Sequence, residues 1–379
     1  MVADALYFPA CRSRRRIELL SIRLPTRPVG NTKLTVPELG FGAAPLGNLY
    51  RAMSDDDARD TALAALLGGI TYFDTAPYYG FGLSERRVGD AVRGHESIVV
   101  STKVGRLLKP DSAIQGAGSR HGFYSPMPFQ PVYDYSFDGV MSSWEASRQR
   151  LGLARIDILY VHDIGRMTHG DQHEVSFRQL TSGGGFRALE ELRSSGEISA
   201  FGLGVNETAI CLEAMKYVNL DVILLAGRYT LLEQDSLNDL LPACARSRTS
   251  IVIGGPYNSG ILARGTKRGD THYNYDIAPS EIIERVRRIE THCDRFRIPL
   301  AAAALQFPLA NPVVASVIPG LSNPHHVEQT LSLYRTSIPA EFWHDLKTDG
   351  LLHVDAPVPT CITAADPSQP HALKPGYPT

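Results

Sequence analysis

The chain of 379 residues is 43% hydrophobic and 21% charged, with a formal net charge of −2. This composition is ordinary for a soluble enzyme with a large core, and no strongly basic balance indicates nucleic acid as a partner. No apolar run is long enough to span a membrane, and the early arginines, Arg12 and Arg14 to Arg16, are not followed by the apolar segment of a secretory signal.

The five cysteines are scattered, odd in number and without metal-ligand spacing: Cys11, Cys211, Cys244, Cys293 and Cys361. This usage predicts free thiols in a reducing, cytoplasmic compartment. Length alone allows two domains, but barrels of this size often form one. We expect an N-terminal extension over residues 1–23, a barrel over 24–350 and a C-terminal tail over 351–379.

Short apolar segments alternate with helical patterns along most of the chain. Strands are predicted, in order, at 39–47 (running into a glycine-rich turn), 70–74, 98–103, 156–162, 200–205, 222–225, 250–253 and 314–318. Helices are predicted after most of them, at 54–66, 85–92, 139–151, 186–193, 206–217, 237–245, 281–296, 301–309 and 325–334. The first helix has Ser54 as its N-cap and acids in its first turn, and Asn206 is expected to cap the helix through Tyr217.

The segment from Gly105 to about Phe137 shows no periodicity and contains four prolines and several aromatic residues. A loop of this length inside a compact domain is usually functional or disordered. Its aromatic content favours a loop that covers a site.

Eight strands alternating with helices predict an α/β fold of the (β/α)₈, or TIM, barrel type with long active-site loops. The alternative is a doubly wound sheet, which would carry a G-x-G-x-x-G fingerprint after its first strand. The segment Gly40–Gly47 lacks that spacing, so the barrel is favoured.

Four polar residues fall at the carboxyl ends of neighbouring predicted strands: Asp74, Tyr79 just beyond it, Lys103 and His162. Taken singly, such residues are more often turn, surface or packing residues than catalytic ones. Together they suit hydride transfer to or from a carbonyl. A phenol is a suitable proton donor, a nearby ammonium lowers its pKa, a carboxylate holds the ammonium, and a histidine orients the substrate oxygen.

The motifs Asp74-Thr-Ala-Pro-Tyr-Tyr-Gly80, Ser101-Thr-Lys103 and Val161-His162 resemble the tetrad motifs of the aldo-keto reductases. The resemblance extends from about Gly30 to Tyr334. It implies a barrel that binds a nicotinamide dinucleotide without a Rossmann fold. It also implies that Tyr79 is the general acid/base, that Lys103 and Asp74 tune it, and that His162 orients the carbonyl or carbinol.

Three further segments are similar to the sugar C1 dehydrogenases of this family: 42–48, 78–85 and 226–234. The resemblance implies oxidation of the anomeric hydroxyl of an L-fucose or D-threo-aldose type sugar to a lactone, with Tyr79 taking the proton. A pyridoxal 4-dehydrogenase is one alternative. A nicotinamide-binding regulatory subunit with weak turnover, like the potassium-channel beta subunits, is another.

By the same resemblance, a set of residues would contact the cofactor: Ala43, Asp74, Asn206, Gly255, Pro256, Tyr257, Ser259, Gly260, Gly320, Ser322, His326 and Gln329. Ala226 and Gly254 stand where many relatives have a glutamine and an aromatic residue that hold the nicotinamide. No Arg or Lys occurs in residues 320–330 to pair with a 2′-phosphate, which favours NAD over NADP while leaving NADP possible.

The substrate is expected to contact Tyr78, Tyr79, His162 and Tyr124, with Phe81 and Tyr257 as further candidates. Aromatic faces suit sugars, although packing is the alternative explanation for each ring. No metal site is predicted, and a monomer or homodimer acting on a small sugar or aldehyde is expected.

Overall fold

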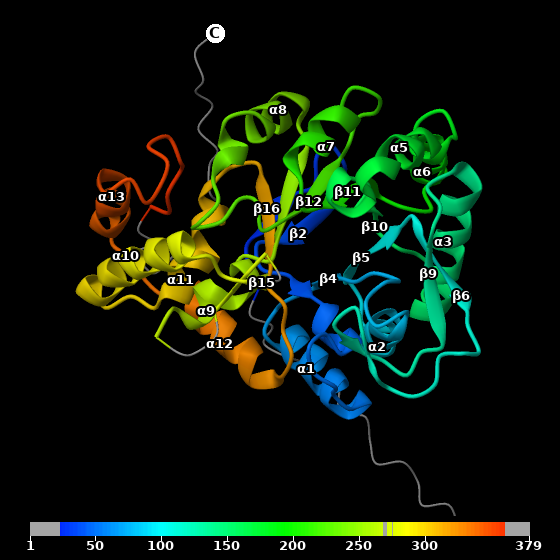
Figure 1. The fold of residues 1–379 in the computed structure, drawn as a ribbon, viewed down its shortest axis with the longest axis horizontal. Helices are drawn as coiled ribbons and strands as arrows, with labels where there is room; N and C mark the ends of the chain where they lie inside the picture. The colour runs from blue at the N-terminus through cyan, green and yellow to red at the C-terminus, as the bar shows by residue number, and fades with distance from the viewer. Residues whose placement is uncertain (1–22, 268–270, 275, 361–379) are drawn as a thin grey trace, which may run out of the picture.

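The computed structural model describes residues 23–267, 271–274 and 276–360. Residues 1–22 of the predicted extension over 1–23, and residues 361–379 of the predicted tail over 351–379, therefore lie outside the described residues. The centre of the molecule is an eight-stranded parallel sheet curled into a barrel with helices around it (Figure 1). Its strands, in spatial order, are β3 (Phe41–Gly42), β4 (Tyr72–Asp74), β5 (Val99–Val104), β10 (Ile158–His162), β11 (Ala200–Val205), β12 (Val222–Ala226), β13 (Ser250–Gly254) and β16 (Val314–Ile318).

Isolated parallel bridges join the two ends of this sheet. Leu39 pairs with Val317, and Gly42 with Gly320. The amide of Gly42, the last residue of β3, donates to the Pro319 carbonyl at 3.0 Å. A Cβ on Gly42 would lie 2.9 Å from the Ile318 carbonyl oxygen, so only glycine allows the two backbones to approach this closely. The predicted barrel is confirmed.

The outer ring consists of the helices that follow each strand: α1 (Asp55–Leu67), α2 (Leu83–Val92), α3 (Phe137–Leu151), α6 (Gly185–Ser194), α7 (Thr208–Ala214), α8 (Leu240–Ser247), α11 (Leu300–Gln306) and α12 (Pro324–Tyr334). Helix α1 begins as predicted. The Ser54 side chain accepts a hydrogen bond from the Asp57 amide, and the Asp57 carboxylate accepts one from the Ser54 amide. The cap expected at Asn206 is wrong. The N-cap of α7 is Glu207, and the helix ends at Ala214 rather than Tyr217.

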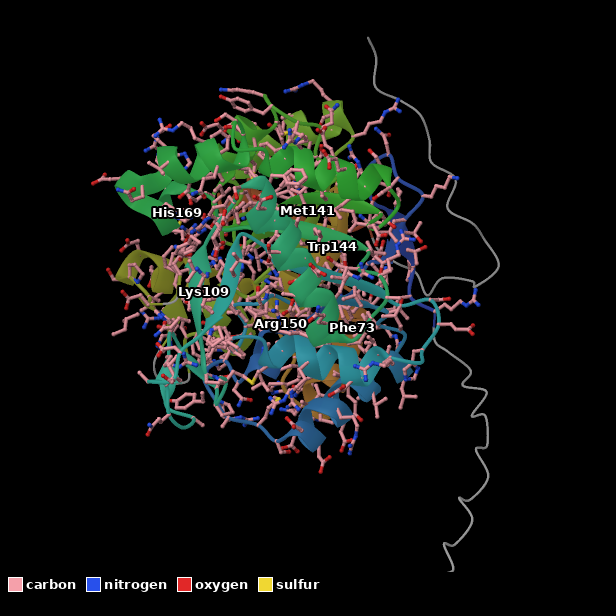
Figure 2. All side chains as sticks on the ribbon, turned by 90° about the vertical axis from the view of Figure 1, so that its right-hand side faces the viewer. Phe73, Lys109, Met141, Trp144, Arg150 and His169 are labelled. Carbon is pink, nitrogen blue, oxygen red and sulfur yellow. The ribbon has the colours of Figure 1, made fainter. Side chains whose placement is uncertain are left out.

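A buried carboxylate fixes two of these helices to the strand that carries Lys103. Glu85 on α2 is fully buried and accepts hydrogen bonds from Thr102 of β5 at 2.6 Å and from Arg150 of α3 at 2.5 Å. Figure 2 shows Arg150 on α3 below Met141 and Trp144. A buried carboxylate that accepts two donors holds their elements in one relative position.

The barrel interior is filled in layers, as in other barrels of this type. Its lower part is mostly apolar, and the inward-facing side chains include Tyr72, Val99, Ile158, Tyr160, Ala200, Val222, Leu224, Val252, Ala315 and Ile318. A hairpin of β1 (Thr26–Pro28) and β2 (Thr35–Pro37) contributes Val29 and Val36 to the same cluster. This hairpin was not predicted. It covers the end of the barrel opposite the carboxyl ends of the strands.

The long segment after β5 is an ordered pair of hairpins, not the aperiodic loop expected from the sequence. Strands β6 (Arg106–Pro110) and β9 (Phe129–Tyr133) pair antiparallel, and β7 (Ser119–Arg120) and β8 (Phe123–Tyr124) form a second small pair. In Figure 2 the long hairpin, marked by Lys109, stands beside α3. The small pair is joined to the loop after β3 by an antiparallel bridge between Leu49 and Phe123.

Other elements extend the regular pattern. They include η1 (Ala44–Gly47), α4 (Arg166–His169), η2 (Gly170–Gln172), α5 (His173–Leu180), η3 (Asp235–Leu237), η4 (Asn258–Gly260), α9 (Ile261–Arg264), β14 (His272–Tyr273), β15 (Asp276–Ile277), α10 (Ser280–Phe296), η5 (Phe307–Ala310) and α13 (Ala340–Thr348). None of the described helices is both long and apolar enough to cross a membrane.

The described cysteines, Cys211, Cys244 and Cys293, are buried and free, as predicted. Burial raises the pKa of Cys244 and Cys293 to about 12.

Candidate active site

A buried ion pair lies at the carboxyl end of the barrel, between the neighbouring strands β4 and β5. The Lys103 ammonium donates to Asp74 Oδ2 at 2.7 Å and to the Thr75 carbonyl at 2.8 Å. Both side chains are almost completely buried. Burial raises the pKa of Asp74, opposed by Lys103 and Ser101. Burial also works against the charge of Lys103, but Asp74 and Tyr79 outweigh it and raise the lysine pKa. Each charge is thus maintained by the other.

The Lys103 side chain has room to cross the barrel because Gly204 on β11 carries no side chain. A Cβ at that position would lie 3.3 Å from Lys103 Cε and 3.2 Å from Tyr160 Cβ. Both contacts are tighter than ordinary van der Waals separations. A side chain at Gly204 would therefore require Lys103 or Tyr160 to move by a few tenths of an ångström.

Tyr79 lies on the turn after β4 and reaches back to this ion pair. The Lys103 ammonium lies 4.6 Å from the centre of the Tyr79 ring. It also forms a hydrogen bond with the Tyr79 side chain. The turn is held close to the loop after β3: Gly80 has φ +64°, and a Cβ there would lie 2.4 Å from the Gly47 carbonyl oxygen. Two glycines facing each other thus allow the turn to place Tyr79 over the barrel mouth.

His162, at the end of β10, completes the cluster. Its ring centre lies 6.0 Å from that of Tyr79, nearly perpendicular to it. Burial, followed by the positive charges of Arg106 and Lys103, holds the pKa of His162 well below its usual value, so the ring is neutral near pH 7. Its Nδ1 is buried and has no hydrogen-bond partner among the described residues. A neutral imidazole in this position can donate one hydrogen bond to a substrate oxygen.

A cavity of about 780 Å³ opens beside this cluster, bounded by the loops at the carboxyl ends of the strands. Asp74 and Tyr79 lie in its wall. So do all but one of the other residues expected to contact the cofactor, namely Asn206, Gly255, Pro256, Tyr257, Ser259, Gly260, Gly320, Ser322, His326 and Gln329. Ala43 does not line the cavity. It lies behind the wall, where its amide donates to the Asp74 carbonyl and its carbonyl accepts from Ser84.

The wall suits a dinucleotide. Ala226, Gly254 and Gly320 present backbone without a large side chain, and Asn206, Ser322, His326 and Gln329 supply hydrogen-bonding groups. Helix α12 begins at the cavity with Asn323 as its N-cap, and such a helix end favours anionic groups. Arg51 and Arg264 also line the cavity. Both cations come from outside residues 320–330, the segment expected to hold any partner of a 2′-phosphate.

The four residues expected to contact substrate do not share one surface. Tyr78 packs edge-on against His162, with ring centres 6.2 Å apart, and lies beneath the Arg106 guanidinium at 4.2 Å. Tyr124 is more than one-third exposed, and its backbone is bonded to Asn48. Only Tyr79 lines the main cavity, while Phe81 is fully buried. Phe81 therefore packs against its neighbours rather than facing a ligand.

Sequence reasoning missed a second buried ion pair beside His162. Arg106 donates to Asp163 at 2.5 Å, and that carboxylate lies 3.5 Å from His162 Nε2. Asp163 has φ +45°, a conformation unfavourable for most residues. Two positional signals were available: an arginine just after the Lys103 strand and an acid directly after His162. Neither forms part of a motif by itself.

Comparison with known proteins agrees with this architecture. The family model described as "Aldo/keto reductase family" matches residues 38–348. A pyridoxal 4-dehydrogenase of Microbacterium luteolum is 47% identical over 334 residues, covering 86% of this chain and 97% of the relative. A D-threo-aldose 1-dehydrogenase of a Pseudomonas species is 40% identical over 317 residues, covering 83% and 94%.

Among solved structures, an aldo-keto reductase of Bacillus halodurans in its holo form superposes with a TM-score of 0.66 at 25% identity, covering 87% of this chain and 97% of that one. A glycerol dehydrogenase of Gluconobacter oxydans gives the same TM-score at 20% identity, covering 89% and 98%, and so supports the fold. The chain belongs to the aldo-keto reductase family and is an NAD(P)-dependent oxidoreductase.

Proposed function

We propose that this enzyme oxidises a cyclic hemiacetal to a lactone, with Tyr79 as the proton acceptor. The observation that carries the proposal is the Tyr79–Lys103–Asp74 cluster, with a neutral His162 beside it, at the edge of a cavity suited to a dinucleotide. When bound there, a nicotinamide supplies the hydride acceptor. The protein's own task is to hold the hemiacetal oxygen and to remove its proton.

The four side chains divide that task. His162 donates a hydrogen bond to the hydroxyl of the reacting carbon and orients it. Tyr79 takes the hydroxyl proton as the C–H bond breaks. Lys103, held by Asp74 at 2.7 Å, stabilises the anionic phenolate that accepts this proton. The proton is transferred within one cluster of side chains, and the negative charge that it neutralises on Tyr79 lies beside the Lys103 ammonium.

Two substrate classes fit this chemistry. Pyridoxal has an aldehyde beside a hydroxymethyl group and can close to a cyclic hemiacetal, as an aldose does. The relative at 47% identity is named for pyridoxal and the one at 40% for a D-threo-aldose. We propose these hemiacetals as the candidates, with L-fucose as the aldose. The partly buried ring of Tyr78, which packs edge-on against His162, is the aromatic surface proposed for the ring of the substrate.

We propose NAD as the preferred cofactor, with NADP accepted less well through Arg51. Residues 320–330 provide no cation for a 2′-phosphate. Arg51, however, lines the cavity and is close enough to His326 to lower the pKa of that histidine, after the larger effect of burial and that of His325. Arg51→Ala should therefore reduce kcat/KM for NADP more than for NAD. Equal losses would contradict this role.

The proposed activity is tested by the absorbance of reduced nicotinamide. The purified protein is mixed with NAD or NADP and with pyridoxal, L-fucose, D-arabinose or L-galactose in turn. Reaction of the product with hydroxylamine distinguishes a lactone from a free acid. Turnover on pyridoxal alone, on the sugars alone, or on both assigns the substrate class.

Formation of a carboxylic acid without a lactone would contradict the hemiacetal mechanism. Cofactor binding without turnover on any of these compounds would favour the regulatory alternative. The Tyr79→Phe variant serves as the control, because any residual rate in that variant is independent of the proposed base.

A further inference from the structure

A continuous chain of hydrogen bonds lies beneath the catalytic cluster, inside the barrel. Ser101 Oγ is 2.7 Å from Asp74 Oδ1. The Tyr72 hydroxyl is 3.1 Å from Ser101 Oγ, and the Tyr160 hydroxyl is 3.1 Å from that of Tyr72. These three hydroxyl-bearing residues come from three adjacent strands, β4, β5 and β10, and each is 0% exposed.

The direction of this chain follows from its chemistry. The ionised Asp74 can only accept, so Ser101 donates its single hydroxyl proton to it. Ser101 has no second hydroxyl proton, so it accepts a hydrogen bond from Tyr72. Because the single hydroxyl proton of Tyr72 is donated to Ser101, Tyr72 accepts from Tyr160. Burial raises the pKa of both tyrosines, and they remain protonated donors. All three O–H dipoles therefore point toward Asp74.

We propose that Tyr160, Tyr72 and Ser101 are positioning residues that set the proton affinity of Tyr79 through Asp74 and Lys103. Aligned hydroxyls polarise one another and draw charge away from the carboxylate. Asp74 is bound through Oδ1 to this chain and through Oδ2 to Lys103. The Lys103 ammonium contacts both Asp74 and Tyr79. The pKa of the Tyr79 phenol therefore depends on how much of the ammonium charge is offset by the Asp74 carboxylate.

Several other ionisable groups face the same cluster, and they stay unchanged in the test below. They are Tyr78 on the turn after β4, Arg106 at the start of β6, His162 on β10 and Asp163 beside it.

The sign of the effect is fixed by the direction of the dipoles. Without a hydroxyl donor, the Asp74 carboxylate carries more uncompensated negative charge. This charge opposes a phenolate nearby, so the pKa of Tyr79 should rise and oxidation should require a higher pH. Ser101→Ala removes the direct donor and should have the largest effect. Tyr72→Phe should have a smaller effect, and Tyr160→Phe the smallest.

The experiment measures the pH dependence of Tyr79 ionisation in two ways. One is the ultraviolet absorbance of tyrosinate, taken as the difference between each variant and the same variant with Tyr79→Phe. The other is the pH profile of kcat for whichever compound is turned over. Tyr229→Phe is the matched control, since Tyr229 is also a fully buried tyrosine but packs against Phe307. Cofactor binding, followed by fluorescence, confirms that each variant is folded.

We expect a shift to higher pH of about half a unit or more for Ser101→Ala, decreasing in the order given, and none for Tyr229→Phe. A lower kcat with an unmoved pH midpoint would show that the chain is merely structural and would overturn the proposal. A shift to lower pH would overturn it too. This inference rests on the proposed role of Tyr79, but the optical titration needs no substrate. Retained turnover in Tyr79→Phe would contradict the proposed role of Tyr79 as the base. An optical shift in Ser101→Ala would still support the effect of the hydrogen-bond chain on the pKa of Tyr79.

Discussion

The hydroxyl of Tyr79 is the group that we propose as the proton acceptor. It lies beside a buried ammonium and at the wall of the cavity. Tyr79→Phe removes the proton acceptor while keeping the ring and its packing. We expect kcat to fall by about 10²- to 10⁴-fold, the usual range for a general acid/base. Stopped-flow absorbance measures the loss, and unchanged cofactor affinity is the control. A near-normal rate would exclude Tyr79 as the acceptor.

His162 should make the stability of the protein depend on pH. Its pKa is well below 6.5 in the folded state because of burial and two nearby cations. Below pH 6.5 the unfolded chain therefore binds a proton that the folded chain does not. Stability should fall as pH decreases through this range, by up to about 1.4 kcal/mol per pH unit from this residue, and remain constant above it.

Urea unfolding between pH 5 and 8 checks this expectation. His162→Gln should make the curve flatter below about pH 6.5. The exposed His344→Gln is the control and should leave the slope as it is. His169 and His326, whose pKa values are also lowered by burial, contribute a remaining slope in every variant. An identical slope in the His162 variant would contradict its assignment as a neutral buried ring.

At the scale of elements, one arginine organises the loop that forms part of the cavity wall. Arg87 on α2 donates to the Leu46 carbonyl, to the Asn48 side chain and to the Met53 carbonyl, at 2.7 to 2.9 Å. Asn48 in turn donates to the Tyr124 carbonyl at 2.7 Å. Arg87 thus connects a helix, the loop after β3 and the small hairpin in one network.

Arg87→Met should loosen this loop and raise the KM for cofactor by roughly tenfold, with a smaller change in kcat, because lost hydrogen bonds to a charged donor cost about 1.5 kcal/mol or more. Arg86→Met is the matched control, since Arg86 and Arg87 both donate to Asp55, but no hydrogen bond from Arg86 to the loop carbonyls occurs among the described residues. Initial-rate kinetics with varied cofactor distinguish the two. Equal effects in both variants would indicate a contribution through Asp55 alone.

The regular elements were predictable because their patterns are local. The capping box at Ser54, the strand ending at Asp74 and the strand ending at His162 all follow from neighbouring residues. The hairpins at 106–133 were not predictable. Prolines interrupt their alternation, and β6 pairs with a strand far along the chain, for example Arg106 with Tyr133. A further bridge, between Leu49 and Phe123, joins the small hairpin to a distant loop.

The site shows the same division. The tetrad motifs identify four residues, but their neighbours depend on the fold. Arg106 and Asp163 meet only because β5 and β10 are adjacent. Ser101 belonged to a recognised motif, but its link to two interior tyrosines appears only when three strands are brought side by side. Asn206 had two expected roles, and the structure separates them: it does not cap α7, but it does line the cavity where a cofactor contact was expected.

At the scale of the whole molecule, the barrel depends on the seam where its first and last strands meet. Gly42 lies on this seam with the Ile318 and Pro319 carbonyls 2.9 and 3.0 Å from the place of a Cβ. Gly42→Val should therefore force the strands apart and cost about 1–3 kcal/mol, as overpacking does. Gly118→Val, at a glycine with open space around it and no positive φ, is the matched comparison outside the seam.

Denaturant unfolding measures the difference, and cofactor affinity should fall with Gly42→Val because Gly42 also lines the cavity. A fully stable Gly42→Val variant with normal affinity would show that the seam can open without affecting the rest of the barrel.

The strands of the barrel form two neighbouring groups: a first arc of β4, β5 and β10, and a second arc of β11, β12, β13 and β16. The tetrad occupies β4, β5 and β10 with their loops, and the hairpin β6–β9 adjoins them. The expected cofactor contacts come mainly from segments after β11, β13 and β16. We therefore expect substitutions in the loops of the first arc to change the choice of substrate more than the affinity for the dinucleotide. Asp74 and Tyr79 are the exceptions, because both also line the cavity. On this expectation, a barrel of this kind can change its substrate during evolution while its second arc stays the same.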